Sequence, residues 1–176
     1  MAPASETGRL WTHQLQLTIA DFVDEIHDTH HHIASSLYYR DQAKEAKRRT
    51  QHFLAERIPK YLGYFDGIIA GKKYMVGRSL TYADLSIFQI IAGLRYAFPK
   101  TMARSEKKYR GLVALHDRVA AWPRIASYLA SVRRIPFNEE GSFAITPSLK
   151  LDLSSFRSRQ KYLPTRCTSG IASAFS

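Results

Sequence analysis

Apolar residues recur every three or four positions between residues 9 and 40, and this spacing predicts one long amphipathic helix. A second helical pattern covers about 43–70, with Pro59 inside it and Gly71 directly after it. Proline lacks the N–H that bonds to the preceding turn, so we expect a kink at Pro59. Glycine readily adopts a left-handed backbone, so we expect Gly71 to end the helix.

The third helical pattern begins with the most specific start signal in the chain. Residues 81–84 read Thr-Tyr-Ala-Asp, the Thr-x-x-Asp form of a capping box. The Thr81 hydroxyl can accept from the Asp84 N–H, and the Asp84 carboxylate can accept from the Thr81 N–H. Residues 85–94 are apolar on almost all sides, so this helix is expected in the middle of a bundle. We interpret Thr81 and Asp84 as structural residues.

The rest of the pattern completes an all-α prediction. Further helices are expected at about 105–121 and from Pro123 to about Ser131, and no pair of strands emerges. The sequence therefore predicts a bundle of five or more helices around one core. In order along the chain we expect a short lead at 1–8, a helical domain at 9–145 and an irregular, disordered tail at 146–176.

The charge balance is basic. The chain of 176 residues carries 26 Lys and Arg against 15 Asp and Glu, a net charge of +11, and basic residues concentrate between Lys100 and Arg134. Such a stripe can attract nucleic acid or anionic lipid, and the alternative is a solvated helix face. Because no nucleic-acid-binding motif accompanies the stripe, we expect no nucleic-acid partner.

Cysteine usage and hydropathy bear on location. No apolar run is long enough for a membrane-spanning helix, and the first residues do not resemble a secretory signal. Cys167 is the single cysteine, so the chain cannot form an internal disulfide. We therefore expect a cytoplasmic protein with no membrane association.

Histidines form the most conspicuous cluster of chemically active side chains. His27 and His31 are four positions apart, close to Asp24 and Asp28, which is a usable spacing for metal ligands. The alternative is a polar helix face, and because no fixed third ligand is visible we predict no metal site. No Ser-His-Asp arrangement, phosphate-binding loop or pair of catalytic carboxylates stands out, so we predict no catalytic residue.

Several segments follow one another in a characteristic order. They are the acidic segment Val23–Asp28, Arg57-Ile58-Pro59-Lys60-Tyr61-Leu62, Tyr74-Met75-Val76-Gly77, the capping box with its flanking Leu80 and Leu85, and Trp122-Pro123-Arg124-Ile125. This succession resembles the C-terminal all-α domain of glutathione S-transferases, most closely the sigma-related group. The resemblance covers about residues 10–143.

The resemblance implies roles for three residues. Asp28 matches a family aspartate that reaches across a dimer to the amino group of glutathione, and the alternative is a solvated surface acid. Tyr38 and Tyr39 are expected at the end of the first helix, where the family binds its electrophilic substrate. The alternative for both tyrosines is core or interface packing.

The resemblance also implies an activity and its limits. Family members place a thioredoxin-like domain, which activates the glutathione thiol, before the helical domain, and we expect this chain to lack it. The helical domain would supply a hydrophobic wall that binds the electrophile and part of a homodimer interface. In this role it would serve glutathione conjugation and detoxification. The helical domain alone is expected to be inactive. Glutathione is then a co-substrate only where a thioredoxin-like domain is supplied, and no cofactor is expected. The alternative is a non-catalytic scaffold that binds a partner protein.

Overall fold

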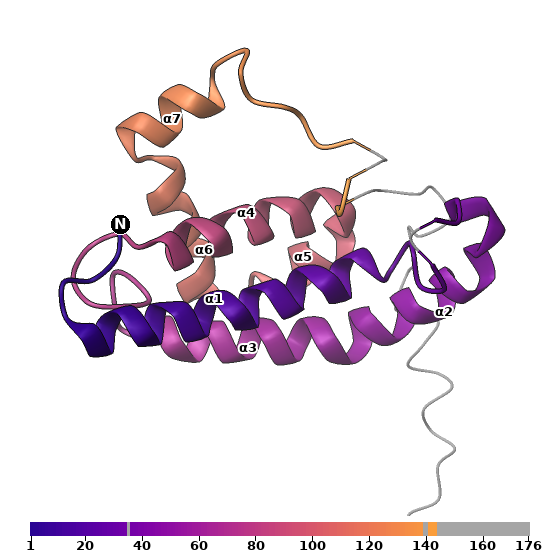
Figure 1. The fold of residues 1–176 in the computed structure, drawn as a ribbon, viewed down its shortest axis with the longest axis horizontal. Helices are drawn as coiled ribbons and strands as arrows, with labels where there is room; N and C mark the ends of the chain where they lie inside the picture. Colours follow the sequence, from indigo (N-terminus) through magenta and orange to yellow (C-terminus); the bar gives the residue numbers. More distant parts are fainter. Residues whose placement is uncertain (35, 139–140, 144–176) are drawn as a thin grey trace, which may run out of the picture.

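The computed structural model describes residues 1–34, 36–138 and 141–143, and this part of the chain contains helices and no strand. The predicted all-α fold is therefore confirmed (Figure 1). The elements are α1 (Glu6–His27), the 3₁₀ turn η1 (Tyr39–Asp41), α2 (Ala43–His52), the π turn η2 (Phe53–Arg57), α3 (Ile58–Ile69), α4 (Tyr82–Ala97), α5 (Pro99–Ser105), α6 (Arg110–Ala120) and α7 (Pro123–Leu129).

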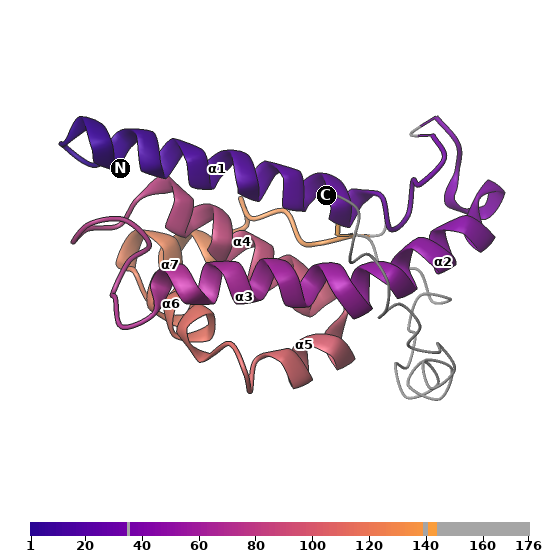
Figure 2. The ribbon, with the colours of Figure 1, turned by 90° about the horizontal axis from the view of Figure 1, so that it is seen from below.

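Helix α4 lies in the middle of the bundle, as its apolar sequence predicts. It packs against α1 on one side and against α6 on the other, and α6 in turn packs against α3 (Figure 2). The core is continuous through these helices and contains fully buried side chains from each of them, including Leu15, Phe22, Phe65, Ile87, Leu94 and Leu115.

Helix α1 is shorter than predicted at its C-terminal end. It begins at Glu6, where the Ser5 hydroxyl accepts from the Gly8 N–H at 3.2 Å, and it ends at His27. The prediction that it continues to residue 40 is wrong, and Ile33 and Leu37 are 56% and 37% exposed.

Local side-chain hydrogen bonds explain why the helix stops. The Thr29 hydroxyl donates to the Ile26 carbonyl at 2.7 Å, and the His30 ring contacts the His27 carbonyl at 3.2 Å. Side chains that bond to nearby carbonyls compete with the next helical turn. Apolar spacing does not report this competition, so the periodic pattern overestimates the length of the helix.

The second helical segment is interrupted next to Pro59. The π turn η2 joins α2 to α3, and the Ile58 N–H donates to the Phe53 carbonyl, five residues earlier. Pro59 has no N–H to donate to the Ala55 carbonyl, so the α-helical pattern cannot pass unchanged through this position. The sequence predicts the place of the interruption, and the structure shows that it takes the form of a π turn.

Gly71 ends the α3 segment in the predicted left-handed conformation. Its φ is +68°, and the Lys72 N–H donates to the Ile69 carbonyl at 2.7 Å to close the turn. Residues with a Cβ rarely adopt this φ, which explains glycine here.

Proline begins two of the later helices. The helix predicted at about 105–121 is α6, which starts later, at Arg110, and a separate helix that was not predicted, α5, starts at Pro99 and ends at Ser105. Pro123 begins α7 as predicted. A proline in the first turn of a helix loses no internal hydrogen bond, so Pro99 both follows the end of α4 and starts α5.

Two further predictions concern a membrane-spanning helix and the C-terminal tail. None of the helices in the described part combines the length and apolar character needed to span a lipid bilayer. The tail predicted at 146–176 lies outside the described residues.

Candidate functional site

Asp28 lies at the C-terminal cap of α1 and pairs with a cation from α2. Its Oδ2 is 3.8 Å from Nη2 of Arg49, and its side chain is 46% exposed. The same Arg49 nitrogen lies 3.5 Å from Oε2 of Glu25. Asp28 is thus held by its own chain while one side of the carboxylate remains open to solvent.

Glu25 is the centre of a polar network that sequence reasoning missed. Arg57 donates to it through Nε at 2.8 Å to Oε2 and through Nη2 at 2.6 Å to Oε1. The Tyr61 hydroxyl donates to Oε1 at 3.0 Å. A two-pronged guanidinium contact of this kind is among the stronger hydrogen bonds in proteins. The signal that could have found it is the four-residue spacing of Arg57 and Tyr61, which places both on one face of the helical segment that runs from the end of η2 into α3.

The network shifts the pKa of its members in opposite directions. The hydrogen bond from Arg57 holds the pKa of Glu25 below its ordinary value, although burial acts against it. Burial, and then the hydrogen bond to Glu25, raises the pKa of the Tyr61 hydroxyl. Glu25 is therefore ionised and Tyr61 is protonated at neutral pH. The Glu25 carboxylate accepts the hydrogen bond that the Tyr61 hydroxyl donates.

Replacing Glu25 by glutamine is expected to lower the free energy of unfolding by about 2 kcal/mol at pH 7, because the charge-assisted bonds from Arg57 and Tyr61 are lost. A carboxylate whose folded pKa is lowered contributes stability above its ordinary pKa of 4.5 and loses it as the pH falls through the folded value. The difference between wild type and Glu25→Gln should therefore shrink in acid. Urea denaturation at pH 7 and below pH 4 (roughly the unfolded pKa of Glu) measures it. Asp21→Asn, on an exposed part of α1, should change little at either pH, and a pH-independent effect of Glu25→Gln would contradict the ion-pair explanation.

Tyr38 and Tyr39 do not end the first helix, because α1 stops at His27. They lie at the 3₁₀ turn η1, where the Tyr38 side chain is 71% exposed and the Arg40 guanidinium lies 5.1 Å from its ring centre. Tyr39 is partly buried. Core packing therefore does not account for Tyr38, whose ring is available to a ligand or partner.

Gln42 fixes the loop that carries the tyrosines, and the sequence gives no clear signal for this role. Its side chain is fully buried. Its Oε1 accepts from the Ile33 N–H at 2.7 Å, and its Nε2 donates to the carbonyls of Ala34 and Leu37, each at 3.1 Å. One amide side chain thus replaces the hydrogen bonds that a longer helix would have supplied.

His27 and His31 come together, as their spacing predicts. Their rings stack with centroids 4.8 Å apart, and burial followed by the charge of His27 lowers the pKa of His31. Among the described residues, no three His, Cys, Asp or Glu side chains form a group that could hold a metal ion. The pair lies beside Asp28 but not in a shared coordination site with it.

An apolar groove of about 340 Å³ runs between α1 and α4, and its lining includes Asp24, four positions before Asp28. Phe143 lies against it and over Gly93, where an added Cβ would overlap the aromatic ring. The groove is lined by Gln16, Ile19, Ala20, Val23, Asp24, Ser86, Gln89, Ile90 and Phe143.

The capping residues Thr81 and Asp84 are both buried at the start of α4. Oδ2 of Asp84 accepts from the Thr81 N–H and from the Thr81 hydroxyl, each at 2.7 Å. Its other oxygen accepts from the Met75 N–H at 2.8 Å. Asp84 thus ties the connection before α4 to the helix itself, a structural role remote from Asp28.

These features define an all-helical domain with a central apolar helix, a buried cap at its start and a polar network at the end of α1. The chain belongs to the glutathione S-transferase family: residues 27–132 match the family described as glutathione S-transferase, C-terminal domain.

Named relatives agree with this family. The chain is 29% identical over 93 residues to a glutathione S-transferase of Plasmodium falciparum, covering 48% of this chain and 42% of that protein. It is 30% identical over 87 residues to a glutathione S-transferase of Plasmodium yoelii yoelii, covering 48% and 40%. It is 33% identical over 76 residues to the hematopoietic prostaglandin D synthase of Gallus gallus, covering 43% and 36%. The matches thus span well under half the length of these curated relatives.

Proposed function

We propose that this chain serves as the helical part of a glutathione transferase, supplying the wall against which a hydrophobic electrophile binds. The observation that carries the proposal is the match of residues 27–132 to the C-terminal domain of that family. The apolar groove between α1 and α4 and the exposed ring of Tyr38 offer surfaces for such a substrate. Tyr39, partly buried beside Tyr38, is proposed to support this surface.

Asp28 is proposed to bind the amino group of glutathione held by another domain or subunit. Its carboxylate is half exposed, which leaves room for an ammonium group alongside Arg49. In the reaction, the glutathione thiolate forms a bond to an electrophilic carbon and the leaving group departs from that carbon. The helical chain contributes position and apolar surface to this step, while a thioredoxin-like domain activates the thiol.

A homodimer is proposed as the assembly in which the chain acts. Leu10 and Leu17 are seven positions apart on α1, so they share a face, and they are 64% and 50% exposed. Burying such a pair against a second subunit removes apolar surface from water. A cytoplasmic location stays a prediction.

A chimeric enzyme tests the proposal. The purified chain alone is expected to give no conjugation of 1-chloro-2,4-dinitrobenzene with glutathione, whereas fusion behind the thioredoxin-like domain of a family member should produce it. In the active fusion, Asp28→Asn should lower kcat/KM for glutathione by about tenfold, because one charge-assisted bond is lost. Asp21→Asn, two turns earlier on an exposed part of α1 and outside the groove lining, is the matched control and should leave kcat/KM unchanged.

Two results would count against the proposal. Conjugation by the isolated chain would show that it needs no second domain. A fusion that melts cooperatively, binds glutathione and still lacks activity would favour the alternative, a non-catalytic scaffold for a partner protein.

A further inference from the structure

The end of α7 and the segment after it project from the bundle. Helix α7 packs against α6 and contains no buried residue, and it stands above the other helices in Figure 1. The chain then turns sharply: the Arg134 N–H donates to the Ser131 carbonyl at 3.2 Å, and the Ser131 hydroxyl donates to the Tyr128 carbonyl at 2.8 Å. We refer to residues 128–135 as the α7 tip. Its own hydrogen bonds give this tip a defined shape.

The α7 tip exposes aliphatic side chains to water. Val132 occupies a central position of the turn and is 103% exposed, and Ile135 is 81% exposed. These two are the most exposed large apolar side chains in the part of the chain that the structure describes. Tyr128, four positions before Val132, is exposed as well. Apolar groups gathered on a projecting surface gain free energy when an apolar medium or partner covers them.

Positive charge accompanies these apolar side chains. Arg133 and Arg134 stand between Val132 and Ile135 in the sequence, and both are exposed. Within the described residues, no Asp or Glu forms an ion pair with either arginine. Residues 118–138 contain four arginines and no Asp or Glu. The α7 tip therefore combines aliphatic groups with cations and carries no acid of its own.

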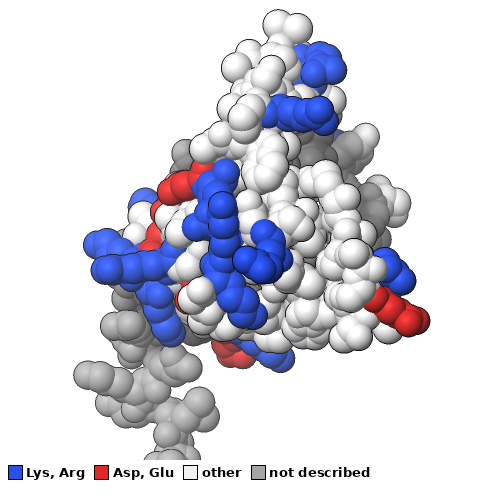
Figure 3. Space-filling model, turned by 90° about the vertical axis from the view of Figure 1, so that its left-hand side faces the viewer, with Lys and Arg blue, Asp and Glu red and all other residues white. Residues whose placement is uncertain are grey.

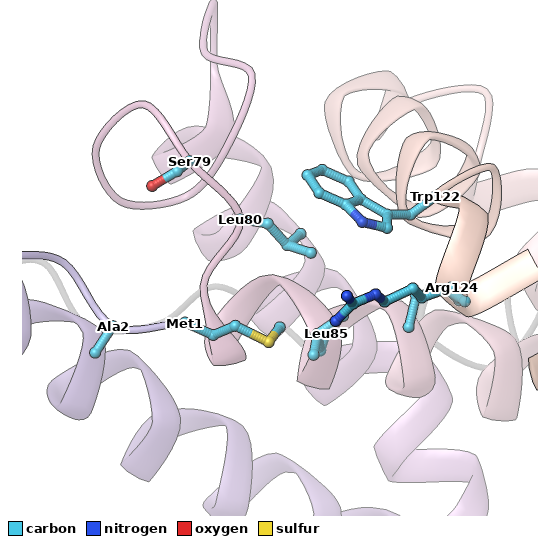
Figure 4. Close-up of a pocket in the computed structure, with 8 residues that line it drawn as sticks. Met1, Ala2, Ser79, Leu80, Leu85, Trp122 and Arg124 are labelled. Atoms are coloured by element: carbon cyan, nitrogen blue, oxygen red, sulfur yellow. The ribbon is translucent and has the colours of Figure 1, made fainter.

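Further arginines lie nearer the bundle. Arg124, in the first turn of α7, extends across a depression toward Leu85, below the Trp122 ring (Figure 4). Arg118 is fixed by its Nη1, which donates to the Lys73 carbonyl at 2.7 Å. Lys and Arg side chains gather on this end of the molecule (Figure 3). They raise the positive potential around the α7 tip, and such a potential attracts anionic surfaces.

This combination favours an anionic lipid surface over nucleic acid as the partner of the basic segment. Nucleic acid is bound through its phosphates and through aromatic rings that stack on bases, and Val132 and Ile135 offer no ring for stacking. A bilayer rewards both features of the tip. Aliphatic side chains enter the boundary between headgroups and acyl chains, arginines attract anionic headgroups, and tyrosine is enriched at that boundary.

We propose that the α7 tip docks on anionic lipid membranes. Val132 and Ile135 enter the outer layer of the bilayer, and Arg133 and Arg134 pair with anionic headgroups. Attachment of this kind needs no spanning helix, so the lack of a long apolar run, from which no membrane association was expected, does not bear on it. The proposal goes beyond the proposed function, because it concerns where the chain is held and does not depend on glutathione.

Co-sedimentation of the purified full chain with lipid vesicles tests the charge requirement. The chain is expected to bind mixed vesicles of phosphatidylcholine and phosphatidylserine, and to bind vesicles of phosphatidylcholine alone much more weakly. The double variant Arg133→Gln, Arg134→Gln should weaken binding to the mixed vesicles by about tenfold or more. Lys44→Gln with Lys47→Gln removes the same charge from exposed positions on α2, at the other end of the bundle, and should weaken binding much less (Figure 1).

A change at Val132 separates docking of the tip from attraction by charge alone. Val132→Ser keeps every charge and should weaken binding to the mixed vesicles by roughly fivefold, because an aliphatic group no longer enters the bilayer. Ile33→Ser, at a side chain that is 56% exposed between α1 and α2, is the matched control and should leave binding unchanged. All these side chains are exposed, so the variants should melt cooperatively, as the wild type does.

Several results would overturn the proposal. Lack of binding to the mixed vesicles is one, and equal binding to both kinds of vesicle is another. Equal losses in the two double variants would show that the α7 tip has no special part. Full binding by Val132→Ser would show attraction by charge alone. If Val132→Ser instead changed the oligomeric state and left vesicle binding intact, the tip would be an interface between copies of the chain.

Discussion

Replacing Asp84 by alanine is expected to lower the free energy of unfolding by about 4 kcal/mol, because a buried acceptor is removed from several donors at once. The Asp84 side chain is fully buried, and its oxygens accept from the N–H groups of Met75 and Thr81 and from the Thr81 hydroxyl. Loss of a helix cap costs about 1 kcal/mol, and each buried donor left without a partner adds about 1–3 kcal/mol. Urea denaturation followed by circular dichroism measures the change.

A graded series makes the Asp84 prediction specific. Asp84→Asn keeps one acceptor oxygen, so its free energy of unfolding should lie between the value of the wild type and the value of Asp84→Ala. Asp21→Ala removes a carboxylate from an exposed position on α1 and should have little effect. Equal effects of Asp84→Ala and Asp21→Ala would show that the contacts around the α4 cap contribute nothing to stability.

Phe22→Ala is expected to cost about 4 kcal/mol through the cavity left at the centre of the core. Phe22 is fully buried, and its ring stacks on Tyr61 with centroids 4.2 Å apart and an interplanar angle of 12°. It also lies 6.1 Å, centroid to centroid, from Phe53. Phe22 thus joins α1 to the first residue of the π turn and to α3 beyond it, and a void there weakens both contacts.

Calorimetric melts of Phe22→Ala and of an exposed aromatic control give the test. Tyr128 is 42% exposed on α7, so Tyr128→Ala should lower the melting temperature only slightly. Phe22→Leu refills part of the cavity and should recover part of the lost stability. If Phe22→Ala melted at the temperature of Tyr128→Ala, the proposed position of Phe22 at the core centre would be wrong.

Features set by local sequence were predictable, as two positions show. Gly71 has the left-handed backbone that its place after a helical pattern indicates, because the reason lies in one residue and its neighbours. The apolar character of residues 85–94 places α4 inside the bundle, since a helix without a polar face has to be covered.

Features that depend on partners distant in the sequence were not predictable in the same way. Glu25 looks like one more acid on a polar helix face until Arg57 and Tyr61 are brought to it across 32 and 36 residues. The second role of Asp84, as acceptor for the Met75 N–H, depends on the path of the connection before α4. The end of α1 was missed because the bonds of Thr29 and Gln42 compete with a helix that apolar spacing alone would continue.

The π turn Phe53–Arg57 has a consequence for the rotational phase of the segment around it. One added residue turns everything before it by about 100° about the helix axis relative to an uninterrupted α-helix. In the observed phase, the Thr50 hydroxyl donates at 3.1 Å to the carbonyl of Thr29, just after the end of α1, while Tyr61 on the other side still reaches Glu25 on α1. Both attachments, to Glu25 on α1 and to Thr29 just after it, depend on this extra residue, so deleting one residue between Thr50 and Tyr61 would break one of the two contacts.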